Sequence, residues 1–269
     1  MADREPAGMH DHYADAEEAR RLDAGAGRLE WMRTWAVLER HLPEPPATVL
    51  DVGGGPGRYS VELASRGHAV RLLDPVERHV EEAARRLAAI RTAPSATAEV
   101  GDARALPAAD GSTDVVLLLG PLYHLQERND RLAALAEARR VLRPGGVVAA
   151  AAISRFASLM DGLRKGLIDD PEFRSIVDGD LEHGRHVNPT GHPRYFTTAY
   201  FHRPDELREE VAAAGFAIAD LVSLEGPAWM ADDLDRWLVD DAMRERLLGW
   251  LARVESEPAL LGAGAHLLA

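Results

Sequence analysis

Between residues 48 and 153, short apolar stretches alternate with segments whose apolar residues have helical spacing. The apolar stretches are nearly continuous, which is typical of strands that are buried on both faces of a sheet. Strands separated by helices run parallel, because each helix returns the chain to the edge where the strand began. The pattern predicts an α/β fold with a doubly wound, mostly parallel sheet. Expected strands are 48–52, 69–73, 97–100, 113–119 and 147–153, and expected helices are 59–66, 76–90 and 128–142.

The rest of the chain predicts additions to this sheet. A helix is expected at 28–41, before the first strand. After residue 153 the alternation breaks, and the next clear signal is a helix that Asp170-Pro171 begins and Gly184 ends. Further expected elements are helices at 204–214 and 234–254 and strands at 216–224 and 265–268.

Composition limits the class of partner. The chain has 269 residues, of which 46% are hydrophobic and 28% charged, so it suits one main domain with an elaboration. Its net charge of -13 disfavours a nucleic-acid partner, because binding to phosphates needs a basic surface. A small or cationic substrate fits this charge better.

Two absences in the sequence narrow the chemistry. There is no Cys, which removes disulfides, thiolate nucleophiles and zinc–thiolate sites. The first residues are polar, and no apolar run approaches the roughly 20 residues of a membrane helix. We therefore expect a cytoplasmic protein with no membrane partner, either a monomer or a homodimer.

A glycine cluster, Gly53-Gly54-Gly55-Pro56-Gly57, follows the first expected strand. Glycines at such a point let a ligand approach the backbone amides at a helix N-terminus. A dinucleotide loop would need Gly at position 58, which is Arg58, and Pro56 removes an amide donor. Asp51 would also repel a pyrophosphate but attract a cation. The cluster therefore favours a cationic ligand, and a strand–helix turn that binds nothing is the alternative.

The run Asp51-x-Gly53-x-Gly55-x-Gly57 resembles the nucleotide-binding loop of class I S-adenosylmethionine (AdoMet)-dependent methyltransferases. The resemblance covers about residues 48–153, including the Leu142–Gly146 turn. It implies a Rossmann-like, seven-stranded sheet with an antiparallel last pair and a helical lid insertion. AdoMet carries both an ammonium and a sulfonium group, and its product is S-adenosylhomocysteine.

The same resemblance implies a set of cofactor ligands. Asp74 would accept hydrogen bonds from the ribose hydroxyls, and Asp102 would accept one from the adenine amino group. His79 would pack on the adenine or else face solvent from a helix. An N-terminal segment would cover the cofactor through Tyr13 and Arg28. The implied set is Asp51, Gly53, Gly54, Gly55, Gly57, Asp74, Pro75, His79, Gly101, Asp102, Ala103, Leu119, Gly120, Tyr13 and Arg28.

The segment after the fourth strand, residues 119–125, lies where class I enzymes contact both cofactor and acceptor. Enzymes that methylate nucleobase amino groups or glutamine amides have an Asp/Asn-Pro-Pro-Tyr motif there, and Gly120 and Leu122 depart from it. This departure disfavours nucleic-acid and protein acceptors. His124 is a candidate general base, since histidine titrates near neutral pH, or a packed histidine that holds the loop. Tyr123 would line the cofactor or the acceptor.

The insertion after the fifth strand is expected to form a lid over the acceptor. The candidate acceptor-binding residues are Arg155, His186, Asn188, Tyr195 and Tyr200 of this insertion, Tyr123 after the fourth strand and Trp229 after the sixth. Phe156, Met160 and Leu163 are expected in the lid core. Histidines 183, 186 and 192 suggest a metal, but without Cys or a fixed carboxylate pattern no metal site is expected.

Four segments follow: an N-terminal helical segment over the cofactor (1–46), the AdoMet-binding core (47–153), the lid (154–203) and the completion of the sheet (204–269). The function expected is methyl transfer from AdoMet to an O, N or C atom of a small molecule by in-line displacement. A non-catalytic AdoMet-binding protein of the same fold and, less favoured, a nicotinamide-dependent oxidoreductase are the alternatives, because fold alone does not choose among them.

Overall fold

The computed structural model describes residues 22–269, which form two compact units. The first, here called the sheet unit, comprises residues 37–151, 208–219 and 269. The second comprises the described residues up to 36 together with residues 152–207 and 220–268. It is here called the lid unit only because it contains residues 154–203, the segment that the sequence analysis expects to form a lid. Each unit thus joins stretches that are distant in sequence, whereas the sequence analysis divided the chain into consecutive segments. Those segment boundaries remain a prediction.

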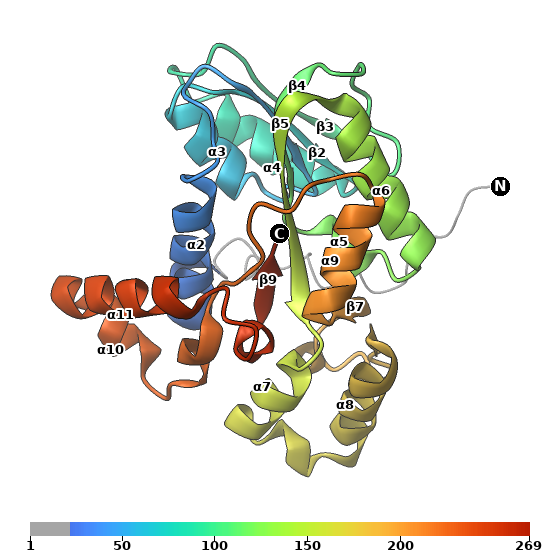
Figure 1. Ribbon diagram of the computed structural model, residues 1–269, viewed down its shortest axis with the longest axis vertical. Helices are drawn as coiled ribbons and strands as arrows, with labels where there is room; N and C mark the ends of the chain where they lie inside the picture. Colours follow the sequence, from blue (N-terminus) through green and yellow to red (C-terminus); the bar gives the residue numbers. More distant parts are fainter. Residues whose placement is uncertain (1–21) are drawn as a thin grey trace. The chain divides into compact units, whose positions relative to one another are not determined.

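The sheet unit contains the predicted parallel sheet (Figure 1). Its strands lie in the order β3-β2-β1-β4-β5, and every pair along this order is parallel. Because β1 and β4 are central, their side chains are almost completely buried. The strands are β1 (Thr48–Val52), β2 (Ala69–Asp74), β3 (Ala96–Val100), β4 (Thr113–Leu118) and β5 (Leu142–Ser154), the last of which continues into the lid unit.

Helices connect these strands where the sequence predicted them, and α5 is a short helix that was not expected. α3 and α4 pack on each other and on β2, and α4 also packs on β3. Since all five strands are parallel, the loops after β1, β2, β3 and β4 leave the sheet at the same edge. The helices are α3 (Arg58–Ser65), α4 (Glu77–Leu87), α5 (Pro121–His124), α6 (Arg128–Val141) and α9 (Pro204–Ala213), of which α9 belongs to this unit from Arg208 on.

The lid unit has its own small core. Asp170 caps α8 by accepting a hydrogen bond from the Glu172 amide, and Gly184, with a φ of 72°, ends this helix as predicted. Apolar residues of α8 pack with Leu167 and Tyr195. The elements are α2 (Gly25–Leu38), α7 (Ala157–Lys165), α8 (Pro171–His183), β6 (Arg185–His186), β7 (Ala199–His202), β8 (Val222–Ser223), α10 (Leu234–Val239), α11 (Asp241–Val254) and β9 (His266–Leu268).

Three expectations for the lid unit are wrong. The strand predicted at 216–224 is only β8, because its antiparallel partner β9 has just three residues with which to pair. The helix predicted at 234–254 is two helices, since Asp240 leaves helical geometry and caps α11 through the Met243 amide. Leu163, expected in the lid core, is 58% exposed. The antiparallel pairing of the last two strands is confirmed.

None of the helices in residues 22–269 has the length and apolar character needed to span a membrane.

Candidate functional site

The glycine cluster forms a tight loop at the carboxyl end of β1. The amide of Gly53 donates to the Leu73 carbonyl at 2.7 Å, which ties the loop to the end of β2. Gly55 has a φ of 54°, a conformation that other residues rarely adopt, and a Cβ atom there would meet nothing within 4 Å. The loop thus presents bare backbone to open space at Gly55. This is the geometry that a backbone-binding ligand needs.

Asp51 lies beneath this loop and is only 1% exposed. The Ser60 hydroxyl donates to its Oδ2 at 2.6 Å. Burial raises the pKa of Asp51 to about 6, the Ser60 hydrogen bond opposes that rise, and the nearby Asp74 carboxylate adds to it. An uncompensated negative charge is therefore costly here, so the site favours a positively charged ligand near the loop.

Asp74 ends β2 and connects the loop to the start of α4. Its Oδ2 accepts a hydrogen bond from the Gly55 amide at 2.8 Å, and its Oδ1 accepts one from the Val76 amide at 2.9 Å. The His79 Nδ1 is 3.2 Å from the same Oδ1. A carboxylate oxygen can accept two hydrogen bonds, so Oδ2 retains one acceptor position beside Gly55. Asp74 is thus placed to accept a ligand hydroxyl without losing its contact with the loop.

His79 is 7% exposed and faces Asp74 from α4. His79 thus contacts Asp74, the residue predicted to bind the ribose, and does not have the solvent-facing position considered from sequence. Pro75, between Asp74 and α4, is exposed. The predicted adenine contact of His79 stays a prediction.

Asp102 follows β3 at the same edge of the sheet, after Gly101 and before the buried Ala103. Its side chain is 48% exposed and pairs with Arg104, whose Nη2 donates to Oδ2 at 2.7 Å. The Arg104 hydrogen bonds hold the pKa of Asp102 below its usual range. Asp102 is therefore a carboxylate that a ligand can reach, with Arg104 as a competing partner.

The segment after β4 touches the glycine loop. A Cβ atom on Gly53 would be 2.8 Å from the Pro121 Cγ, and one on Gly120 would be 3.2 Å from the Gly53 carbonyl oxygen and 3.7 Å from the Tyr123 hydroxyl. The first turn after β4 is therefore seated directly on the loop that follows β1. Leu119 and Gly120, at the end of β4, are half-buried. The structure brings the two predicted cofactor segments into contact.

Tyr123 and His124 lie together at this point, with ring centroids 4.7 Å apart. Both side chains are half-buried, and the His124 Nδ1 is shielded from solvent. A histidine and a phenol in this position can hold or accept a proton from a bound molecule.

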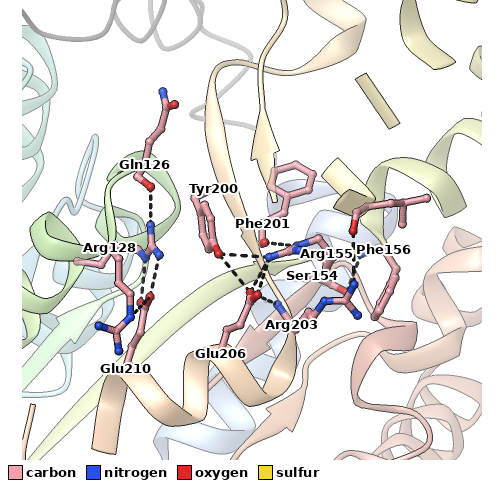
Figure 2. Close-up of polar contacts among 12 residues, drawn as sticks. Gln126, Arg128, Ser154, Arg155, Phe156, Tyr200, Phe201, Arg203, Glu206 and Glu210 are labelled. Atoms are coloured by element: carbon pink, nitrogen blue, oxygen red, sulfur yellow. Dashed lines mark hydrogen bonds and ion pairs between the residues drawn. The ribbon is translucent and has the colours of Figure 1, made fainter. Parts of the chain in front are cut away.

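The predicted acceptor residues of the lid unit use their polar groups within that unit. The His186 Nδ1 is 2.8 Å from Asp180, and its Nε2 is 2.5 Å from the Tyr195 carbonyl oxygen. Figure 2 shows Arg155 directed toward Tyr200 and Glu206; its Nη2 donates to Glu206 Oε2 at 2.6 Å. The Asn188 amide donates to the Phe196 carbonyl at 2.9 Å.

Two aromatic candidates are also held by internal bonds. The Tyr195 hydroxyl donates to Asp170 at 2.5 Å, and the Trp229 Nε1 donates to the Ala263 carbonyl at 2.7 Å. The polar groups of these residues thus have hydrogen-bond partners within the protein. That the residues also bind an acceptor stays a prediction. Arg28 is half-buried on α2, and Tyr13 lies outside the described residues.

One buried pair beside the site was not singled out from sequence. Arg131 on α6 and Glu210 on α9 are 1% and 2% exposed and form a two-point ion pair. They are 79 residues apart in the chain, so no local pattern connects them.

Sequence comparison relates part of this chain to known methyltransferases. Residues 49–146 match the family model described as "Methyltransferase domain". The chain is 36% identical over 131 residues to a ubiquinone/menaquinone biosynthesis C-methyltransferase of Acidiphilium cryptum, a match that covers 46% of this chain and 48% of the relative. It is 35% identical over 157 residues to a demethylmenaquinone methyltransferase of Beutenbergia cavernae, covering 56% and 60%. Both matches span less than two thirds of the relative.

A solved structure shows the same fold. The PH0226 protein of Pyrococcus horikoshii matches with a TM-score of 0.61 at 20% identity, over 80% of this chain and 94% of that one. The predicted α/β fold with a mostly parallel sheet is thereby confirmed.

Proposed function

We propose that this chain is a class I AdoMet-dependent methyltransferase that transfers the methyl group of AdoMet to a small-molecule acceptor, a proposal that the match of residues 49–146 to a methyltransferase domain supports. The observation that carries the proposal is the position of Asp74. One of its carboxylate oxygens binds the Gly55 amide at 2.8 Å and retains an acceptor position for a ribose hydroxyl. The same side chain would thus hold both the cofactor and the glycine loop.

The residues at this edge fit a cationic cofactor. Gly55 offers open backbone, and Asp51 supplies buried negative charge behind it. The exposed Asp102 would accept from the adenine amino group by sharing its oxygens with Arg104. A pyrophosphate would instead meet two neighbouring carboxylates, Asp51 and Asp74. This charge arrangement supports AdoMet over a nicotinamide dinucleotide.

When bound, AdoMet supplies a methyl group already activated on a sulfonium. The protein has to align a nucleophile with that group and exclude water. Held by Asp51, Asp74 and Asp102, AdoMet would supply this methyl group to the acceptor atom and would leave as S-adenosylhomocysteine, with the electron pair of the broken sulfur–carbon bond on sulfur. An acceptor that carries a proton must also lose it, and we assign His124 as the base that takes it, with Tyr123 beside it.

The acceptor we favour first is an electron-rich hydroxylated ring. The two relatives described above are named a ubiquinone/menaquinone biosynthesis C-methyltransferase and a demethylmenaquinone methyltransferase, and a base such as His124 suits a phenolic proton. The acidic charge of the chain, -13, and the departure of residues 120–123 from the nucleobase motif support a small molecule over a nucleic acid.

A transfer assay tests the proposal. The protein is incubated with AdoMet labelled in the methyl group and with one acceptor in each reaction. The acceptors are a naphthoquinol, simple catechols, small amines and duplex DNA. Label is expected in one of the small molecules, with S-adenosylhomocysteine formed in equal amount. Calorimetry with S-adenosylhomocysteine is the companion measurement. Binding without transfer to any acceptor would favour a non-catalytic AdoMet-binding protein, and absence of binding would refute the proposal.

A further inference from the structure

We infer that the buried Arg131–Glu210 pair is a positioning device for the turn that carries Tyr123 and His124. This inference rests on the proposed function, and it assigns to that function two residues that lie outside the predicted cofactor and acceptor ligands. Both residues, and the turn they hold, belong to the sheet unit. Figure 2 shows Glu210 facing guanidinium groups, one of which also reaches Gln126.

Arg131 binds the backbone just after His124. The Arg131 Nη1 donates to the carbonyl oxygens of Leu125 at 3.0 Å and Gln126 at 2.7 Å. These are the two residues that directly follow His124, where α5 has ended and the chain is extended. One nitrogen therefore fixes the backbone at the exit of the turn.

Glu210 in turn fixes the position of Arg131. The Arg131 Nε and Nη2 donate to the two oxygens of Glu210 at 2.9 and 2.7 Å, a parallel fork that fixes the plane of the guanidinium. The Arg128 Nε lies 3.8 Å from Glu210 Oε1 and adds a second positive charge. Glu210 thus sets the angle at which Arg131 meets the Leu125 and Gln126 carbonyls.

The turn is thus held at both ends. At its start, Pro121 and Gly120 are seated against Gly53. At its exit, Arg131 binds the carbonyls that follow His124. Between these two anchors lie only α5 and its two aromatic rings. The directions of Tyr123 and His124 are therefore determined jointly by the glycine loop and by the buried pair.

A stability role alone would not require this pair. Replacing a buried ion pair with well-packed apolar residues is often neutral or stabilising, whereas a guanidinium can fix several acceptors in one plane. Lysine has a single donor nitrogen and cannot reproduce the fork toward Glu210 together with the bonds to Leu125 and Gln126. The pair therefore predicts an effect on geometry that can be separated from an effect on folding.

The experiment compares four variants: Glu210→Gln, Arg131→Lys, the apolar double variant Arg131→Met/Glu210→Met, and the control Arg143→Met. Arg143 is the control for a lost arginine pair in the same unit, because it too binds a carboxylate, that of Asp114, and donates to a carbonyl, that of Ser112, from a half-exposed position. It does so at the start of β4, away from the loops that follow the strands. The double variant remains informative if the single ones fold poorly, since it leaves no buried charge unpaired.

Two readouts are used on the folded variants. The first needs no acceptor: NMR of ¹⁵N-labelled imidazoles in the complex with S-adenosylhomocysteine, where His124→Gln identifies the His124 signals. The second is steady-state transfer to the acceptor found in the assay above. We expect shifted or broadened His124 signals and a kcat about 10- to 100-fold lower in all three Arg131 and Glu210 variants. Affinity for S-adenosylhomocysteine should change by no more than about twofold, and Arg143→Met should match the parent.

The outcomes separate the two proposals. Unchanged His124 signals and unchanged kcat in the folded double variant would overturn the positioning role. Loss of S-adenosylhomocysteine binding in these variants would also overturn it, because the pair would then act on the cofactor. Failure of the unmodified protein to bind S-adenosylhomocysteine would instead refute the proposed function.

Discussion

The carboxylate of Asp51 lies directly against Gly54, where a Cβ atom would stand 2.7 Å from Asp51 Oδ2 and 2.7 Å from Leu72 Cδ1. Only a hydrogen fits at this position, because both neighbours are held by the sheet: Asp51 and Leu72 are paired residues of β1 and β2. The glycine loop and the buried acid are therefore one packed unit. A substitution in the loop should therefore displace the Asp51 carboxylate, and a substitution of Asp51 should alter the loop.

The replacement Gly54→Ala tests this packing. The added methyl group must displace the Asp51 carboxylate or the Leu72 side chain, which we expect to cost about 1–3 kcal/mol of unfolding free energy and to weaken S-adenosylhomocysteine binding at least about tenfold. Urea denaturation and calorimetry measure the two effects. Gly249→Ala is the control, since a Cβ atom there meets nothing within 4 Å on α11 and should leave binding unchanged. Tight binding by Gly54→Ala would contradict the packing argument.

The raised pKa of Asp51 predicts a dependence of stability on pH. With a pKa of about 6 in the folded protein and 3.8 as the ordinary value, the folded state binds more protons than the unfolded state between these limits. Stability from this group is present below about pH 4 and is lost as pH rises through 6, a change on the order of 3 kcal/mol. In Asp51→Asn that loss should vanish, so the unfolding free energy of the variant should increase relative to that of the parent as pH rises. Parallel denaturation curves for both proteins across this range would contradict it.

Cofactor binding should reverse this penalty. A bound cation favours ionised Asp51, so binding of AdoMet near pH 6 is expected to release protons. Calorimetry in buffers of different ionisation enthalpy measures the release, which should disappear in Asp51→Asn. For the pH dependence of stability, Asp114 provides a control whose effect has the opposite sign to that of Asp51. Although burial pushes its pKa up, the Thr48 amide and Arg143 hold the pKa below its usual range, so its contribution is lost as pH falls.

The parts of this fold that follow from local pattern were predictable. The strands and helices around the glycine loop were expected within a few residues of their observed ends, because burial on both faces leaves an almost continuous apolar run. The start of β5 was predicted wrongly, since residues 143–146 were expected as a turn and belong to the strand. The limits of α8 were also read correctly, since Asp170 and Gly184 act within one turn of the backbone. Apolar spacing alone failed at residues 216–221, which pair with no strand within residues 22–269.

The arrangement of polar side chains was not predictable in the same way. Arg131 is one of several arginines on α6, and only the fold brings Glu210 to it. Similarly, Tyr195 and His186 have the residue types of a pocket lining, but in the structure they bond to groups of their own unit. Residue type indicates that a polar partner is needed. It does not say whether that partner is a ligand or the protein.

Asp74 should be the most sensitive single carboxylate for cofactor binding. Asp74→Ala removes the acceptor of the Gly55 and Val76 amides as well as the proposed ribose contact, so we expect affinity for S-adenosylhomocysteine to fall about 100-fold. Asp102→Ala should cost about tenfold or less, because that side chain is half exposed and already shared with Arg104. Calorimetry gives both constants. An Asp102 effect larger than that of Asp74 would reverse the assignment of the two carboxylates.

His124 as a base predicts a specific change in the pH profile of transfer. For an acceptor that carries a phenolic proton, the kcat of the parent should rise as pH increases through the range in which an imidazole loses its proton. His124→Gln should lower kcat by about 10²- to 10⁴-fold at neutral pH and recover part of it at high pH, where the acceptor ionises unaided. Tyr123→Phe is the neighbouring control: its ring is retained, so the imidazole contact persists while the hydroxyl beside Gly120 is lost. If His124→Gln keeps the parental rate and profile, the histidine serves to hold the turn, and the acceptor proton leaves through water.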